Sequence, residues 1–127
     1  VDDTFYEEMK ATGHYIEVAA DTSREAVKEI VKQVDAVYTD TWLDMEFFNN
    51  PEYADKKAEI CGKMMPYQVN TDLMEDSDAI VLHDMPMHAD YEISQKVIDK
   101  YLSHILDQAE NRRHAEKAVM VYLLEHK

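Results

Sequence analysis

The chain has 127 residues, of which 46% are hydrophobic, so it can form one compact core but is too short for two full domains. Its formal net charge of −14 argues against binding to nucleic acid, because contact with a phosphate backbone needs a basic surface. The single cysteine excludes an internal disulfide, and no apolar run approaches the roughly 20 residues that a membrane-spanning helix needs. We therefore expect one cytoplasmic domain over residues 1–127 that binds neither nucleic acid nor a membrane.

The first part of the chain predicts a helix, a strand, a second helix and a second strand. Residues 3–12 have helical character up to a glycine, and residues 15–19 have the composition of a strand. A capping-box pattern starts the second helix at Thr22, and apolar residues recur at helical spacing as far as Val34. The second strand is expected at residues 35–39.

The middle of the chain predicts a long irregular segment followed by a buried strand. Residues 43–66 contain an Asn-Asn-Pro sequence, a short helix after it, a glycine and a second proline, a pattern typical of a functional or mobile excursion. Asn70 can cap a short helix that reaches residue 75. Residues 79–83 form a continuous apolar run of the kind found in buried parallel strands.

The last third predicts a helix at residues 97–101 behind the capping residue Ser94, a short strand at residues 103–106 and a helix at residues 109–125. Strands that alternate with helices in this way indicate an α/β fold, because right-handed crossovers place helices over a parallel sheet. We expect a Rossmann-like parallel sheet of about four strands with helices on both faces.

The sequence offers little support for a cofactor or a metal. Only two glycines occur, and no glycine-rich turn follows a predicted strand, so both the dinucleotide fingerprint and the P-loop are missing. His83, Asp84 and His88 could be drawn as a metal-binding triad, but no further ligand at a suitable spacing supports it. We therefore expect no cofactor and no metal.

Polar residues gather after three of the four predicted strands, at residues 40–46, 83–88 and 107–112. Open parallel sheets bind their ligands beyond the carboxyl ends of the strands. Because those ends lie at the same edge of a sheet, the three segments are predicted to line one polar ligand site.

The same three segments resemble the motifs of the ornithine carbamoyltransferase family, in the same order and at similar spacing. Residues 40–46 resemble its Asp-x-Trp-x-Ser-Met-Gly loop, residues 83–86 its His-Cys-Leu-Pro motif, and residues 108–112 its Glu-Ala-Glu-Asn-Arg motif. The resemblance extends from about Gly13 to the carboxyl terminus. It implies the amine-binding, C-terminal domain of an ornithine/aspartate-type enzyme, which transfers the carbamoyl group of carbamoyl phosphate to an amine.

The resemblance also implies two catalytic residues. His83 would help to polarise the carbamoyl carbonyl group, and Arg112 would contact carbamoyl phosphate. Such a transfer needs preorganised donors at the carbonyl oxygen and cations around the phosphate, because negative charge develops at both places.

The amine substrate would be held by two loops. By the same resemblance, Asp40 would bind an α-amino group and the backbone carbonyl group of Met85 would position the attacking nitrogen. Asp44 and Met45 would belong to the loop that closes over the substrate, and Asp84 would lie beside the amine.

Both loops depart from the family pattern. Asp84 stands where the family has cysteine and Met85 where it has leucine, while Asp44 and Glu46 replace the serine and the glycine of the first loop. A carboxylate at Asp84 would pair with a protonated amine, and two acids in the loop would repel a substrate carboxylate. Two interpretations stay open: a substrate that is more cationic than ornithine, or a lost activity.

The phosphate-binding motifs of the family's other domain do not occur in this sequence. We therefore expect an incomplete second domain that is inactive alone, that works with a missing N-terminal domain, and whose parent enzyme is a homotrimer or a multiple of it. A second hypothesis is a non-catalytic binding or regulatory module derived from the same family. A third is a phosphoacceptor receiver, which fits in length and acidity but needs paired acids after a first strand that this chain lacks.

Overall fold

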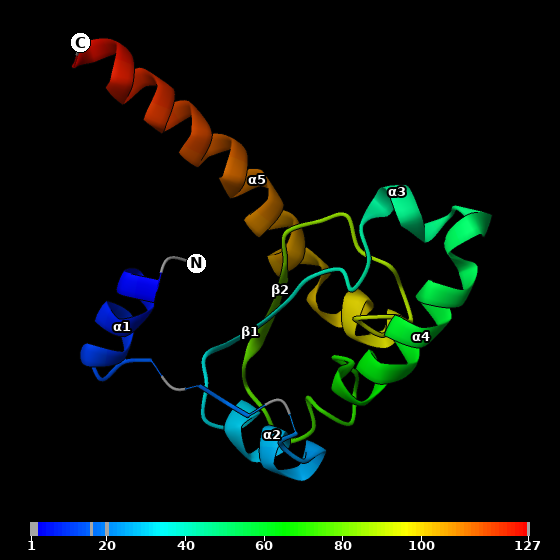
Figure 1. Cartoon of the computed structure of the whole chain (residues 1–127). Coiled ribbons are helices and arrows are strands. Elements are labelled where there is room, and N and C mark those ends of the chain that lie inside the picture. The colour runs from blue at the N-terminus through cyan, green and yellow to red at the C-terminus, as the bar shows by residue number, and fades with distance from the viewer. Residues whose placement is uncertain (1–2, 16, 20, 127) are drawn as a thin grey trace.

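A parallel two-stranded sheet and five α-helices are found in the computed structural model, which describes residues 3–15, 17–19 and 21–126 (Figure 1). In chain order the elements are α1 (Asp3–Ala11), α2 (Arg24–Val31), β1 (Ala36–Thr39), α3 (Met45–Phe48), α4 (Ala54–Met64), β2 (Ile80–His83) and α5 (Gln95–Glu125). Two short 3-10 turns, η1 (Pro51–Tyr53) and η2 (Met65–Tyr67), flank α4. The crossover between the two strands therefore contains all of α3 and α4.

The sheet confirms the predicted parallel α/β type and corrects its size. β1 and β2 are parallel, with Thr39 directly opposite His83. Within the described residues the sheet has these two strands, whereas about four were predicted. Both observed strands lie within one residue of their predicted positions at 35–39 and 79–83.

The predicted strand at residues 15–19 is wrong for the residues that the structure describes there, and Ile16 lies outside them. The described residues are exposed and irregular, with Tyr15 at 37% and Val18 at 45% of full exposure. A strand is stabilised by a hydrogen-bonded neighbour and by burial of at least one face. A β-rich composition supplies neither of these by itself.

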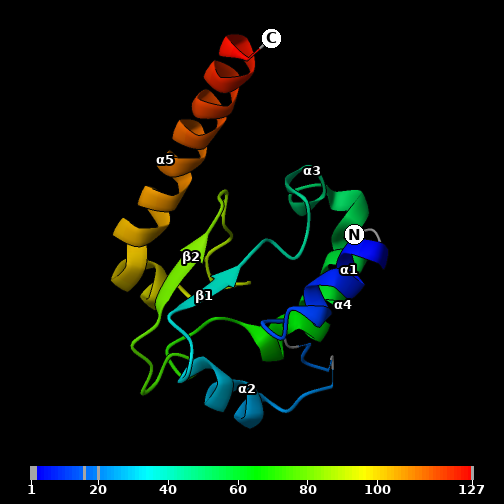
Figure 2. The same ribbon diagram turned by 90° about the vertical axis from the view of Figure 1, so that its left-hand side faces the viewer.

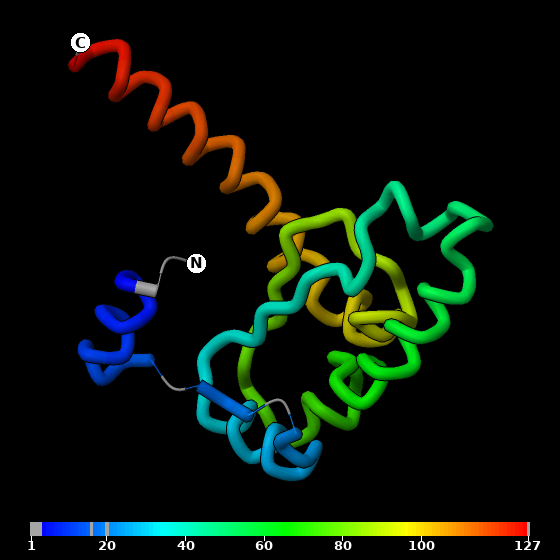
Figure 3. The backbone as a smooth tube through the Cα atoms, in the orientation of Figure 1, coloured from blue at the N-terminus to red at the C-terminus, as the bar shows by residue number. Residues whose placement is uncertain are grey.

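The predicted strand at residues 103–106 is also wrong, because α5 continues unbroken through it, as the tube in Figure 3 shows. The buried residues of α5 recur three or four positions apart: Val97, Ile98, Tyr101 and Ile105. The segment also contains no glycine or proline that would end a helix. The buried residues of this segment are spaced as on one face of a helix, and this pattern determines its structure although residues 103–106 alone resemble a short strand.

The remaining predictions are met only in part. Ser23 rather than Thr22 caps α2, and its hydroxyl oxygen accepts a backbone hydrogen bond at 3.3 Å. Asn70 accepts a backbone hydrogen bond at 3.0 Å, as a capping residue does, but residues 71–76 form turns rather than the predicted helix. The excursion predicted at residues 43–66 is more regular than expected, since it contains α3 and the eleven-residue α4.

The hydrophobic core lies against one face of the sheet. Val37 and Val81 are paired on that face and take part in the core, whereas Tyr38 on the opposite face is 55% exposed. The buried members come from α2, from the segments on either side of β2, from β2 itself and from the first half of α5: Val31, Val69, Leu73, Met74, Ala79, Val81, Ile93, Val97, Ile98, Tyr101 and Ile105. The described residues therefore cover one face of the sheet more fully than the other.

Two helical segments extend away from this core. α1 lies apart from the sheet in two perpendicular views, and the last turns of α5 project beyond it (Figures 1 and 2). The projecting turns expose large apolar side chains, among them Val119, Leu123 and Leu124, each at more than half of full exposure. In the part of the chain that the structure describes, no helix has both the length and the apolar character needed to cross a bilayer.

A cluster of ion pairs joins α2 to the segment that leads into β2. Arg24 donates hydrogen bonds to Asp72 at 3.1 Å, to Asn70 at 2.6 Å and to two nearby backbone carbonyl groups. Lys28 donates to Asp72 at 2.8 Å. Because Lys28 and Arg24 both donate to it, the pKa of the Asp72 carboxyl lies below its ordinary value.

We predict that Ile105→Ala lowers the free energy of unfolding by about 2–5 kcal/mol, because it leaves a cavity at a fully buried position of α5. Its neighbour Leu106, which is 50% exposed, provides the matched control: Leu106→Ala should change stability by about 0.5 kcal/mol or less. Urea unfolding followed by circular dichroism measures both variants. Equal effects of the two substitutions would contradict the packing of α5.

We predict that Asp72→Asn destabilises the chain at neutral pH and that this effect disappears in acid. A depressed pKa in the folded state means that Asp72 contributes stability above the ordinary pKa of an aspartate and loses it as the pH falls through the depressed pKa. Urea midpoints of wild type and variant should therefore converge as the pH is lowered. Asp78→Asn, at an exposed aspartate outside this cluster, is the control, and a difference that grows in acid would contradict the prediction.

Candidate functional site

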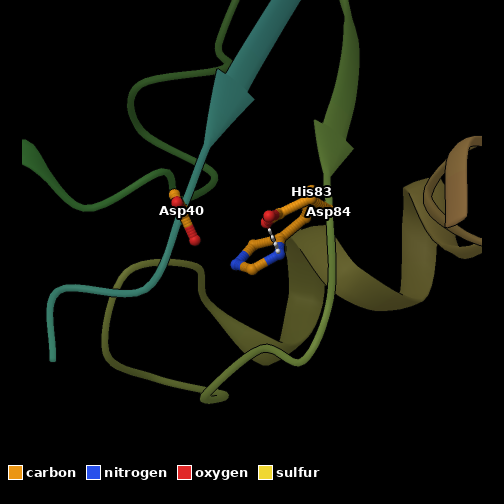
Figure 4. A group of neighbouring side chains, drawn as sticks. All are labelled: Asp40, His83 and Asp84. Atoms are coloured by element: carbon orange, nitrogen blue, oxygen red, sulfur yellow. Dashed lines mark ion pairs between the residues drawn. The ribbon is translucent and has the colours of Figure 1, made fainter. Parts of the chain in front are cut away.

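The parallel pairing brings three polar residues together at the carboxyl ends of the two strands. Because Thr39 lies opposite His83, the residues that follow, Asp40 and Asp84, also lie at this edge. One ligand atom from each of Asp40, His83 and Asp84 lies within 4.8 Å of the other two (Figure 4). The predicted convergence of the first two polar segments is therefore found in the structure.

His83 is completely buried, and both of its ring nitrogens are engaged. Nδ1 accepts a hydrogen bond from the backbone N–H of Met85 at 3.0 Å. Nε2 lies 3.2 Å from Oε1 of Glu92. Since Nδ1 is an acceptor, Nε2 carries the proton and donates to the carboxylate, so the surroundings select one neutral tautomer.

Glu92 is a buried carboxylate, with 1% of its surface exposed, that joins two parts of the site. Besides His83, its Oε1 accepts a hydrogen bond from the backbone N–H of His88 at 2.5 Å. Burial alone would raise the pKa of Glu92, but the hydrogen bonds from His83 and from the His88 backbone hold it below its ordinary value. Glu92 is therefore ionised inside the core, where a charge needs such partners.

Asp84 opens onto a cavity of about 580 Å³ at this end of the sheet. Its Oδ1 lies 3.5 Å from Nδ1 of His83 but has no hydrogen-bond donor among the described residues. Gln108 lines the same cavity, and its buried Oε1 likewise has no donor there. The wall of this cavity therefore contains two buried acceptor oxygens that have no donor among the described residues.

Arg112 lines this cavity together with Asp84, Tyr38 and Asn111. Its guanidinium group is well exposed and donates to Glu116, one turn further along α5, at 3.2 Å. The structure therefore brings Arg112 to the same cavity as Asp84, although the side chain pairs with its own helix.

The other predicted substrate residues lie on the loops around this edge. Asp40 is exposed and accepts a hydrogen bond from the Thr41 N–H at 2.6 Å. Asp44 and Met45, at the start of α3, are exposed and do not line the cavity. Met85 has a φ of 61°, a left-handed conformation uncommon outside glycine, and its side chain packs against the core.

Asp40, His83 and Asp84 match the ligand types of a divalent cation in kind. However, both His83 nitrogens already take part in hydrogen bonds, and an ion would have to displace one of them. His88, the third member of the triad considered from the sequence, lies outside this group and stacks on Phe48 instead.

Sequence reasoning missed Glu92 and the aromatic contacts of Phe48. Glu92 stands between Tyr91 and Ile93 in a polar loop, where an acid is ordinarily exposed. Its burial depends on the course of the loop after β2, which returns Glu92 to His83, nine residues earlier in the sequence. No local pattern in the sequence reports that contact.

Comparison with known proteins shows the family of the chain. The family model of the aspartate/ornithine carbamoyltransferase Asp/Orn binding domain matches residues 2–123. The ornithine carbamoyltransferase of Methanospirillum hungatei is 43% identical over 99 residues, which are 76% of this chain and 31% of that protein. That of Pyrobaculum islandicum is 46% identical over 97 residues, or 74% of this chain and 30% of the relative.

Solved structures give the same result. The anabolic ornithine carbamoyltransferase of Campylobacter jejuni superposes with a TM-score of 0.65 at 28% identity, covering 80% of this chain and 32% of the other. The enzyme of Pyrococcus furiosus gives a TM-score of 0.58 at 38% identity, covering 74% and 29%. The chain spans about 30% of the length of these relatives. By its sequence match over nearly its whole length, the chain belongs to the aspartate/ornithine carbamoyltransferase family and corresponds to the Asp/Orn binding domain.

Proposed function

We propose that this chain binds the amine substrate of a carbamoyl transfer from carbamoyl phosphate, and that it needs a separate phosphate-binding domain for the reaction. The observation that carries this proposal is the grouping of Asp40, His83 and Asp84 at one sheet edge, beside a cavity that Arg112 also lines. Family membership supports the reaction class, since the named relatives are ornithine carbamoyltransferases.

The charge around the cavity supports the need for a second domain. Carbamoyl phosphate is an anion, and its transfer releases phosphate, so the site must neutralise a growing negative charge. Among the described residues that line the cavity, Arg112 is the one basic side chain. A single exposed arginine opposite Asp84 cannot hold a phosphate dianion well, so the remaining cations must come from elsewhere in the working enzyme.

The carboxylates at this edge favour an amine that carries a second cationic nitrogen. The Asp84 side chain is 36% exposed and lines the cavity, and the exposed carboxylate of Asp40 lies at the same edge of the sheet. Because a carboxylate holds an amine in its protonated, non-nucleophilic form, Asp84 is suited to the nitrogen that does not react. A diamine without a carboxylate fits this arrangement better than ornithine does.

A second candidate function, a non-catalytic binding module, is favoured by one observation. Both nitrogens of His83 are engaged within the protein, so the ring can act on a carbonyl oxygen only if the Met85 contact or the Glu92 contact opens. Activity measurements on the reconstituted enzyme distinguish the two functions.

We predict that the chain alone forms no carbamoylated amine from carbamoyl phosphate, and that adding a separately expressed phosphate-binding domain of a relative restores product. Mass spectrometry of the carbamoylated product from ornithine and from diamines measures this. In the mixture, Arg112→Ala should lower turnover about 100-fold or more, because it removes a cation at the developing charge.

Arg113→Ala is the matched control, because Arg113 is the next residue, is similarly exposed and pairs with Glu110. It should leave turnover close to that of wild type. Turnover by the chain alone would contradict the requirement for a second domain. Product from no amine in the mixture would instead favour the non-catalytic module.

We predict that Asp84→Asn weakens binding of a diamine to the chain by about fivefold to tenfold, because it removes the negative charge that faces the cavity. Isothermal titration calorimetry measures the affinity. Asp78→Asn, at the opposite end of β2, should leave the affinity unchanged. Diamine binding that is equally tight in both variants would show that Asp84 does not recognise the amine.

A further inference from the structure

A continuous series of contacts runs from His83 to the loop that carries α3. His83 Nε2 donates to Oε1 of Glu92 at 3.2 Å, and the same oxygen accepts the His88 backbone N–H. The His88 ring stacks on Phe48, the last residue of α3, with ring centroids 3.5 Å apart and an interplanar angle of 14°. A buried carboxylate and one stacked pair therefore join two loops that are far apart in the sequence.

Lys57 and Tyr91 make further contacts with Phe48. Lys57 on α4 lies 3.5 Å from the centroid of the Phe48 ring and donates to the Phe48 backbone carbonyl at 3.2 Å. Tyr91 meets Phe48 edge to face, with centroids 4.9 Å apart. Phe48 is therefore enclosed by an imidazole, a second aromatic ring and a cation, which fixes the end of α3 more firmly than its four residues could alone.

The charge state of His88 suits this stacking. Burial lowers the pKa of His88, and although Glu92 opposes the shift, the cation of Lys57 and the nearby His83 add to it. A neutral imidazole can stack on Phe48 without bringing a second positive charge close to Lys57.

We propose that Glu92 and His88 form a positioning bridge, which holds the α3 loop, Asp40–Phe48, in a fixed relation to the His83 ring. In this bridge, Glu92 accepts the hydrogen bond of His83 Nε2 and places the His88 backbone, and the His88 ring holds Phe48. We assign both residues a positioning role rather than a catalytic one. The kinetic consequence rests on the proposed function: if the α3 loop and His83 serve one amine, loss of the bridge should raise the KM for the amine more than it lowers kcat.

The arrangement of the oxygens in Glu92 distinguishes a bridge from ordinary core packing. Its Oε1 serves both donors, while Oε2 is buried without a hydrogen-bond partner among the described residues. Glu92→Gln retains an acceptor for both donors, whereas Glu92→Leu removes it at nearly constant volume. If Glu92 only fills space, Glu92→Leu should leave the order of α3 unchanged. If Glu92 forms the bridge, Glu92→Gln should preserve that order and Glu92→Leu should not.

Hydrogen exchange of the 127-residue chain tests the bridge without any substrate. The Phe47 and Phe48 N–H groups donate to the Asp44 carbonyl at 2.9 and 3.1 Å, so their exchange rates report the order of α3. His88→Leu and Phe48→Leu should each speed their exchange by about threefold to tenfold, the range expected for loss of one aromatic pair. His104→Leu, at an exposed histidine of α5, is the matched control and should change nothing.

The His83 ring provides a second readout, by ¹⁵N NMR of its imidazole nitrogens. The proton should reside on Nε2 in wild type, in Phe48→Leu and in Glu92→Gln. In Glu92→Leu the Met85 N–H still keeps the proton on Nε2, but the Nε2 resonance should shift because its acceptor is lost. If Glu92→Leu does not fold, His88→Leu and Phe48→Leu still decide the question. Unchanged exchange of α3 in both of these variants, or a wild-type proton on Nδ1, would overturn the bridge.

Failure of the bridge and failure of the proposed function give different results. The exchange and tautomer measurements need neither carbamoyl phosphate nor a second domain. If both measurements agree with the bridge but the chain never supports turnover, the positioning role of Glu92 and His88 is retained and the proposed function is rejected.

Discussion

The parallel pairing of β1 with β2 is the constraint on which the rest of the structure depends. Its register sets Thr39 opposite His83 and so brings Asp40 and Asp84 to one edge. These two residues are far apart in the sequence, because α3 and α4 lie in the crossover between the strands. The first half of α5 packs against β2 and carries the chain towards Arg112. A shift of the register by one residue would turn His83 to the other face of the sheet and separate the group.

The buried carboxylate of Glu92 lies next to the paired strands and holds the His83 side chain in place. Glu92 is ionised at a position with almost no exposure, which would be costly without the donors supplied by His83 and the His88 backbone. The same bonds order the loop after β2, where Met85 adopts a positive φ. His83 is therefore held in place by hydrogen bonds inside the core, and the loop after β2 is attached to it through Glu92.

The sequence was sufficient to predict the parallel pairing, the positions of β1 and β2, and the polar segments that follow these two strands. Apolar runs and polar strand ends are local patterns, so they can be read without the tertiary structure. The strands expected at 15–19 and 103–106 were wrong for a non-local reason. The described residues of the first segment pair with no strand, and the second belongs to a helix whose buried face reaches Ile105. The role of Glu92 could not be predicted, because its burial depends on a contact with His83 that the tertiary fold creates.

Binding of an amine at the carboxyl edge of this two-stranded sheet can be observed by titrating the ¹⁵N-labelled chain with 1,4-diaminobutane and with ornithine, followed by two-dimensional NMR. We expect saturable shifts that centre on the backbone amides of Asp40, Asp84 and Arg112, with the diamine binding more tightly. Shifts confined to α1 or to the projecting turns of α5, or no saturable shift with either amine, would contradict it.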